Sequence, residues 1–189
     1  SFVLDASGQL TGILTLDAVK RALPQLESLG HVLIAQDLAT ADVPVVHCVA
    51  ERRTDGLGSN HNARLFMGML KTGVALTSGT SAVEVIDEFG PAPSDVVLSR
   101  LHGVGPMGGT DLDPVLRNLG ARTVVGIGVS VNVGMLDFAL DAVNAGYQMV
   151  MPRDAVAGVP ADYAEAVIDH TLALLCTLPA TQDVIAAWT

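Results

Sequence analysis

Short valine-rich runs alternate with longer apolar segments along most of the chain, and this alternation limits the possible folds more than any other feature. Residues 43–49, 95–100, 122–129 and 147–156 are predicted strands, because each run is short and turn-forming residues lie beside it. Strands that are joined through helices form right-handed crossovers and a parallel sheet. We therefore predict one α/β domain over residues 1–189, a three-layer α/β/α fold with a mostly parallel central sheet in Rossmann-type winding.

The segments around these strands have helical character. A long region at 17–41 contains Pro24, which marks a kink or a break into two helices. Further helices are predicted at 63–73, 111–119, 134–146, 161–178 and 181–188, and residues 51–62 are predicted to be a loop. Thr110 is the expected N-cap of its helix, with Asp113 completing a capping box, and Thr181 is the expected cap of the last helix.

Composition excludes several classes of partner. The net charge is −10 and the pI about 4.6, so binding to nucleic acid through phosphate contacts is not expected. No apolar run is long enough for a membrane span, and no basic segment precedes an apolar one at the start, which predicts a cytoplasmic protein. Cys48 and Cys176 lie in apolar segments and are expected to be buried free thiols. The histidines show no spacing typical of a zinc site.

The stretch GVSVNVGMLDFALDAVNAGYQ, residues 128–148, runs from the end of a predicted strand into a predicted helix. Ligands in parallel α/β sheets bind beyond the carboxyl ends of the strands, so this corner is a candidate site. The other predicted strand ends carry His47, Arg100 and Asp154. For His47 a buried structural role is equally expected, and Asp154 is expected to cap or pair locally.

Residues 103–108, GVGPMG, match the GxGxxG pattern of dinucleotide-binding loops. That fingerprint also needs an acidic residue at the end of the next strand, and here the next strand ends in GIGVS. Pro106 and the long loop also spoil the tight turn. We therefore expect no cofactor, and we interpret the glycines as positions where backbone approaches a ligand or a neighbouring subunit.

Residues 109–156 read GTDLDPVLRNLGARTVVGIGVSVNVGMLDFALDAVNAGYQMVMPRDAV. This run resembles the isochorismatase-like superfamily, which includes the cysteine hydrolases, and VPVVHCV extends the likeness over most of the chain. The resemblance implies a cis peptide at Val129–Ser130 and a site for developing negative charge made by backbone amides near Gly134. The residues that it places around the substrate are Val129, Ser130, Asn132, Val133 and Gly134.

The position that carries a nucleophilic cysteine in many relatives falls on Gly134, so a thioester mechanism is not expected. The family lysine position falls near Arg100–His102. Arg100 cannot act as a base but can grip a carboxylate, and His102 can exchange protons near neutral pH. For Arg100 a surface or helix-capping role is the alternative. For His102 the alternative is a loop histidine that forms only a hydrogen bond.

The family's catalytic acid usually lies in an Asp-x-Gln motif, and SFVLDASGQL resembles the segment that follows it. The acid is therefore expected before Ser1, or else FVLD is the strand and Asp5 is the acid. Arg64, with Arg52 and Arg53, is a candidate for binding an anionic substrate. The alternative for these arginines is solvated charge or salt bridges between subunits.

Three functions remain open from the sequence. The first is a hydrolase for a small anionic metabolite, in which water attacks after a carboxylic acid donates a proton. The second is a non-catalytic small-molecule binder or scaffold with the same fold, and the third is a nicotinamide-linked oxidoreductase. We also expect a homo-oligomer, dimer or tetramer, as the resemblance implies. Asp137 and Asp141 share a helix face and are interpreted as a solvated edge or a subunit contact.

Overall fold

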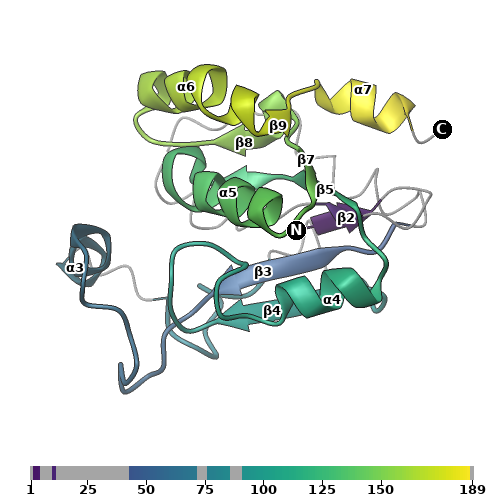
Figure 1. Cartoon of the computed structure of the whole chain (residues 1–189). Helices are drawn as coiled ribbons and strands as arrows, with labels where there is room; N and C mark the ends of the chain where they lie inside the picture. The colour runs from purple at the N-terminus through teal and green to yellow at the C-terminus, as the bar shows by residue number, and fades with distance from the viewer. Residues whose placement is uncertain (1, 5–9, 12–42, 72–75, 86–90, 188–189) are drawn as a thin grey trace.

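The computed structural model describes residues 2–4, 10–11, 43–71, 76–85 and 91–187 of the chain. Helices cover short, mostly parallel strands, which confirms the predicted α/β class and fits a three-layer arrangement (Figure 1). The strands are β1 (Phe2–Leu4), β2 (Leu10–Thr11), β3 (Val46–Ala50), β4 (Val96–Arg100), β5 (Thr123–Gly126), β6 (Gly128–Val129), β7 (Gln148–Val150), β8 (Val156–Ala157) and β9 (Cys176–Thr177).

The helices agree with most of the predicted segments, and the predicted region 17–41 lies outside the described residues. The described α-helices are α3 (Arg64–Lys71), α4 (Leu112–Asn118), α5 (Leu136–Asn144), α6 (Ala161–His170) and α7 (Thr181–Ala186). A π-helical turn covers Val131–Met135, and 3-10 turns cover Arg153–Ala155 and Leu172–Leu174. No helix within the described ranges has the length and hydropathy that a membrane crossing requires.

The described strands fall into three sheets instead of the single sheet that we predicted. The largest has the order β2-β1-β5-β7-β9, while β3 pairs with β4 and β6 pairs with β8. The pairs β3–β4, β5–β7, β7–β9 and β6–β8 are all parallel, as strand–helix alternation predicts. β1 also lies beside β3, so the first strand stands between the two groups.

β1 and β2 depart from the parallel pattern. β1 pairs antiparallel with β2 and also with β5, where Phe2 lies opposite Gly126 and Val3 opposite Val125. Only residues 5–9 separate the two strands, too few for the crossover that a parallel pair needs. Because β1 is antiparallel to β5, the last residues of β1 lie beside the start of β5 and not beside the corner at Val129.

The core lies where α4, α5 and α6 pack on the strands. β3 is buried along nearly its whole length, whereas partly buried and exposed positions alternate along β4. His47 on β3 is completely buried, and its Nε2 lies 2.9 Å from the Asp95 carboxylate, which precedes β4. Burial lowers the pKa of His47, and the hydrogen bond to Asp95 opposes this shift. His47 is therefore a buried structural residue and does not line the candidate site.

The ends of α4 show which predicted capping interactions form. α4 begins at Leu112, so its N-cap position is Asp111 and not Thr110, although the Thr110 hydroxyl does accept a hydrogen bond from the Leu112 amide (3.1 Å). The capping box is wrong, because the Asp113 carboxylate binds Arg117 (3.0 Å) and the Tyr147 hydroxyl (2.9 Å) instead. At the other end Gly120 adopts a left-handed conformation (φ +73°), as expected for a residue just after a helix.

The predicted helix 161–178 is shorter in the structure. α6 ends at His170, a 3-10 turn follows, and Cys176–Thr177 form β9, parallel to β7. The sequence LALLCTL suits a buried helix and a buried strand equally well, so periodicity could not separate them. At the next helix, Thr181 is the first helical residue, and its hydroxyl donates to the Asp154 carboxylate (2.7 Å). Asp154 thus pairs locally, as expected.

Candidate functional site

The predicted corner forms where β6 passes into α5. The Val129–Ser130 peptide is cis, as the resemblance implied, and Ser130 leads into the π-helical turn. The Ser130 carbonyl accepts hydrogen bonds from the amides of Val133 (3.1 Å) and Met135 (3.0 Å). The amide of Val133 is therefore already engaged, so only part of the backbone-donor set that we expected is left for a ligand.

The side-chain amide of Asn132 stabilises this corner through hydrogen bonds of both its oxygen and its nitrogen. The Ser130 hydroxyl donates to Asn132 Oδ1 (2.5 Å), and Asn132 Nδ2 donates to the Val159 carbonyl (3.0 Å). A Cβ on Gly158 would approach Asn132 Oδ1 to 2.8 Å, so the segment before α6 packs closely on this side chain. We conclude that the side chain of Asn132 holds the corner against that segment.

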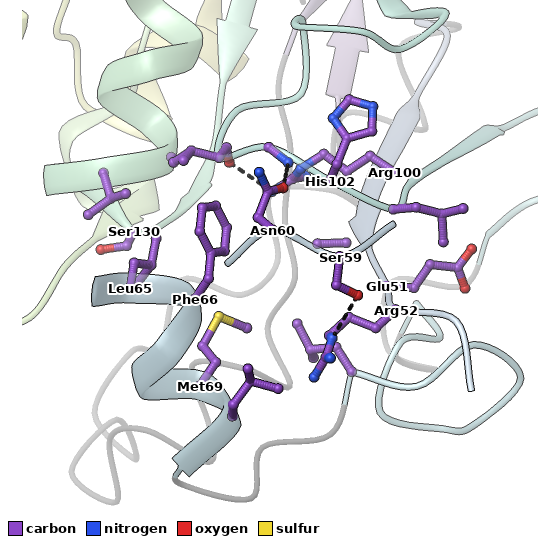
Figure 2. A pocket seen from close by; sticks show the side chains of 18 of the residues that line it. Glu51, Arg52, Ser59, Asn60, Leu65, Phe66, Met69, Arg100, His102 and Ser130 are labelled. Carbon is purple, nitrogen blue, oxygen red and sulfur yellow. Dashed lines mark hydrogen bonds between the residues drawn. The ribbon is translucent and has the colours of Figure 1, made fainter. Parts of the chain in front are cut away.

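A cavity of about 370 Å³ lies beside the corner, at the carboxyl ends of β3, β4 and β6 (Figure 2). It brings together most of the predicted site residues, namely Arg100, His102, Val129, Ser130, Asn132, Val133 and Gly134. Arg64 does not line it and is exposed at the start of α3. Asp5 lies outside the described residues.

Arg100 is a partly buried cation at the end of β4. Its Nη2 donates to the Val104 carbonyl (2.8 Å), but its buried Nε has no hydrogen-bond partner in the described part of the chain. None of the ion pairs among the described residues involves Arg100. Burial lowers the pKa of Arg100, and the nearby Asp137 acts in the opposite direction. A guanidinium stays charged even so, which leaves a partly buried positive charge beside the cavity with no ion-pair partner among the described residues.

His102 follows Arg100 in a loop and is exposed. Its ring lies over Gly109, where a Cβ would come within 2.7 Å of the ring carbon Cε1. Figure 2 shows the imidazole directed away from Phe66 and Met69. The ring therefore stands at the margin of the cavity, on the side opposite α3.

Gly134 faces the same loop from the corner. A Cβ built on Gly134 would lie 3.4 Å from the Val104 carbonyl oxygen and 3.9 Å from that of Val129, which are ordinary contacts. Gly134 is also absent from the glycines with positive φ. Neither the backbone conformation nor the surrounding space requires glycine at this position. Because Gly134 lines the cavity, the volume that a side chain would fill stays part of the cavity.

The loop after β3 supplies polar groups to the cavity, and of these sequence reasoning singled out only Arg52. Asn60 Oδ1 accepts a hydrogen bond from the Gly103 amide (2.8 Å), which ties this loop to the one that carries His102. Arg52 lines the cavity, and its Nε donates to Ser59 Oγ (3.2 Å). Glu51 is the one acidic residue among the described residues that line the cavity. Their sequence signal was weak, because a polar, glycine-rich loop is usually solvated.

The opposite wall is apolar and comes mainly from α3. Its residues Leu65, Phe66, Met69 and Leu70 line the cavity, and Leu76 joins them after the helix. Their spacing places them along one side of the helix. α3 was predicted as an element, but periodicity alone could not show that its apolar side faces a cavity instead of a core.

The GVGPMG loop brings backbone close to α5. A Cβ on Gly105 would lie 2.2 Å from the Asp137 carboxylate, so only glycine fits beside that side chain. The close approach that we predicted for these glycines is therefore made to a helix of the same chain. Asp137 and Asp141 accordingly do not form a fully solvated edge. Burial and the neighbouring Asp137 raise the pKa of Asp141.

Both cysteines lie away from the cavity lining. Cys48 is buried in β3 and Cys176 is partly buried in β9, and neither forms a disulfide. Burial raises the pKa of Cys176 to about 12 and raises that of Cys48 further. Within the described residues, no group of three or more His, Cys, Asp or Glu side chains is placed to hold a metal ion.

Comparison with known proteins supplies the family. A model described as the isochorismatase domain matches residues 17–183. The chain belongs to the isochorismatase family. A secreted isochorismatase effector, Isc1, of Verticillium dahliae is 25% identical over 155 residues, which cover 82% of this chain and 70% of the fungal protein. The ureidoacrylate amidohydrolase RutB of Agrobacterium fabrum is 31% identical over 93 residues, which cover 49% and 40% of the two chains.

Solved structures agree with this membership. An isochorismatase family protein from Desulfovibrio vulgaris superposes with a TM-score of 0.74 at 26% identity, covering 93% of this chain and 96% of that one. An N-carbamoylsarcosine amidase from Thermoplasma acidophilum gives a TM-score of 0.70 at 22% identity, with 90% and 94% covered. The second likeness concerns the fold alone. The isochorismatase-like α/β fold inferred from residues 109–156 is thus confirmed.

Proposed function

We propose that this member of the isochorismatase family hydrolyses a small anionic metabolite by direct attack of water, without a cysteine nucleophile. The observation that carries the proposal is Arg100, a partly buried cation that lines the cavity and forms no ion pair with a carboxylate of the described residues. An ionised group of the substrate would supply the missing negative charge. Gly134 leaves space at the corner for water or for the reacting part of the substrate.

In this mechanism a carboxylic acid donates a proton to the leaving group while water attacks the electrophilic carbon, and the carboxylate so formed takes the proton that the attacking water loses. The amides of Asn132 and Gly134 would hold negative charge that develops on an oxygen, because those of Val133 and Met135 bind Ser130. The resemblance places the acid before Ser1 or, as the alternative, at Asp5, and Glu51 is the acidic residue among the described residues that line the cavity. His102 at the margin would exchange the proton with solvent.

The state of the two thiols supports a mechanism without sulfur. A nucleophilic cysteine works as a thiolate of lowered pKa in an accessible, electropositive place. Cys48 and Cys176 have raised pKa values, and neither lines the cavity. A covalent thioester at either residue would need a thiol that is ionised and that reaches the substrate.

A substrate panel tests the proposal. It should contain vinyl ethers, ureido compounds and amides. One relative of this chain is a ureidoacrylate amidohydrolase, and the chain matches an N-carbamoylsarcosine amidase in fold. Each compound is paired with its methyl ester. We expect turnover of one carboxylate and at least about tenfold weaker turnover of its ester, since one charge-assisted hydrogen bond contributes about 1.5–3 kcal/mol. Equal turnover of acid and ester would contradict the anionic substrate.

A non-catalytic binding protein is the second candidate. It is favoured by the described cavity lining, which contains neither a cysteine nor a lysine. Calorimetry with the same panel separates the two functions. Saturable binding of a carboxylate with no hydrolysis by the purified protein, at any pH between about 5 and 9, would favour the binding protein.

A further inference from the structure

α3 presents an apolar side to the cavity that the protein itself leaves partly uncovered. Leu65 and Leu70 line the cavity and are 44% and 39% exposed. Figure 2 shows Phe66 and Met69 projecting from the same helix toward the loop that carries Ser59 and Asn60. Hydrophobic side chains left in contact with water gain free energy when a ligand covers them.

Arg100 lies at the other wall, and its bonding limits the anion that suits it. One of its terminal nitrogens already donates to the Val104 carbonyl (2.8 Å), so only part of the guanidinium remains for a ligand. Asp137 acts electrostatically on Arg100, and the chain carries a net charge of −10. These features favour an anion of low charge, such as a carboxylate, over a phosphate dianion.

The size of the cavity selects between possible occupants. A volume of about 370 Å³ is that of a small-molecule site. A folded segment of another protein would need a larger groove. The opposed walls, one cationic and one apolar, therefore point to a small molecule with two unlike ends.

We propose that α3 is the specificity element of this site and that the ligand is an amphiphilic carboxylate. Its carboxylate binds Arg100, and its apolar, unsaturated or branched body packs on Phe66 and Met69. This inference rests on the anion site of the proposed function and extends it to the remainder of the ligand. α3 then discriminates between carboxylates by their hydrocarbon part, whereas Arg100 binds all of them.

Equilibrium binding to the purified protein tests this without requiring turnover. Acetate, phenylacetate and phenyl phosphate are titrated by calorimetry against the wild type, Phe66→Ala and Arg100→Gln. Met67→Ala is the matched control, because Met67 is on the same helix, is exposed and does not line the cavity. Met69→Ala serves as a second variant if Phe66→Ala is poorly folded.

We expect wild-type protein to bind phenylacetate at least about tenfold more tightly than acetate, which is the scale of burying one phenyl ring. Phe66→Ala should remove most of the difference in affinity between phenylacetate and acetate, and should leave the affinity for acetate within about twofold of wild type. Arg100→Gln should weaken the binding of both ligands by about tenfold or more. Met67→Ala should change neither affinity.

Three results would overturn the inference. Phenyl phosphate binding more tightly than phenylacetate would exclude a carboxylate as the preferred anion. An unchanged ratio in both Phe66→Ala and Met69→Ala would exclude α3 as the specificity element. A change of oligomeric state in these variants at unchanged affinity would show that α3 meets another copy of the chain. If acetate binding is lost in Arg100→Gln while the α3 variants change nothing, the anion site at Arg100 is supported and the specificity role of α3 is excluded. The two proposals can therefore fail separately.

Discussion

A substitution at Gly134 can test whether the empty space at the corner matters, because it fills that space without changing the backbone conformation. A methyl group there makes ordinary contacts, and the residue does not need a positive φ. We expect Gly134→Ala to keep the free energy of unfolding within about 1 kcal/mol of wild type, since alanine also lowers the entropy of the unfolded chain. Turnover should nevertheless fall by about tenfold or more, because the methyl group fills space needed by water or substrate.

Urea unfolding and steady-state kinetics on the same preparations measure both quantities. Gly108→Ala is a suitable control, because a Cβ there meets only the Asp141 carboxylate at 3.9 Å and Gly108 does not line the cavity. Full activity of Gly134→Ala would show that the empty position has no part in the reaction.

His47 provides a stability prediction with a defined sign. Burial lowers the pKa of His47 below its usual value, so the folded protein resists protonating this ring while the unfolded chain does not. Stability is therefore fully present above a pH of about 6.5 and is lost as the pH falls, with a slope of up to about 1.4 kcal/mol per pH unit.

The midpoint of urea unfolding, followed from pH 8 to pH 5, measures this slope. His47→Leu removes the titrating ring and should have a shallower slope, whatever its absolute stability. His170→Leu is the control, because His170 is exposed at the end of α6. An equal slope in wild type and His47→Leu would assign the acid sensitivity to other groups.

At the level of elements, Thr110 determines how α4 begins. Its hydroxyl accepts from the Leu112 amide and donates to the Pro106 carbonyl, which joins the helix to the preceding loop. We expect Thr110→Ala to lower the free energy of unfolding by about 1 kcal/mol, typical of a lost hydrogen bond. Thr110→Ser keeps the hydroxyl and should lose much less. Chemical denaturation of the three proteins decides this, and equal losses for alanine and serine would show that the hydroxyl does not stabilise the start of α4.

Sequence reasoning located most elements because each has a strong local signal. The valine run at 95–100 and the glycine after α4 needed no tertiary information. The run at 122–129 was predicted as one strand but forms two, β5 and β6, which belong to different sheets. Sequence reasoning missed β9 because the last strand is defined by its pairing with β7 and not by its own periodicity. It also misassigned Asp113, because the partners Arg117 and Tyr147 are brought near by helix geometry and by packing.

The site was predictable where one continuous stretch forms it. Residues 129–134 were found together because a single strand-to-helix corner carries them. Arg52, Asn60 and the apolar side of α3 come from a separate loop and helix, and only the fold brings them to the cavity. Arg64 was selected for its charge, but at the start of α3 its position places it outside the lining.

For the whole molecule, association of chains remains a prediction. Leu140 and Val143 lie one turn apart on α5 and are 43% and 37% exposed, an apolar stripe that suits contact with a second copy. We expect the protein to be a dimer or larger at micromolar concentration by size exclusion with light scattering. The double variant Leu140→Ser with Val143→Ser should shift it toward monomer. A wild-type protein that stays monomeric up to about 100 μM would contradict this expectation.

The proposed reaction uses Arg100, backbone amides and water at the corner, and no sulfur. The sequence contains two cysteines, so one variant, Cys48→Ala with Cys176→Ala, removes every thiol. Turnover of the substrate identified from the panel should be measured for this variant, with circular dichroism to confirm that it is folded. We predict a kcat within about twofold of wild type, since neither thiol lines the cavity. A folded thiol-free protein with no turnover would contradict a reaction that uses no sulfur.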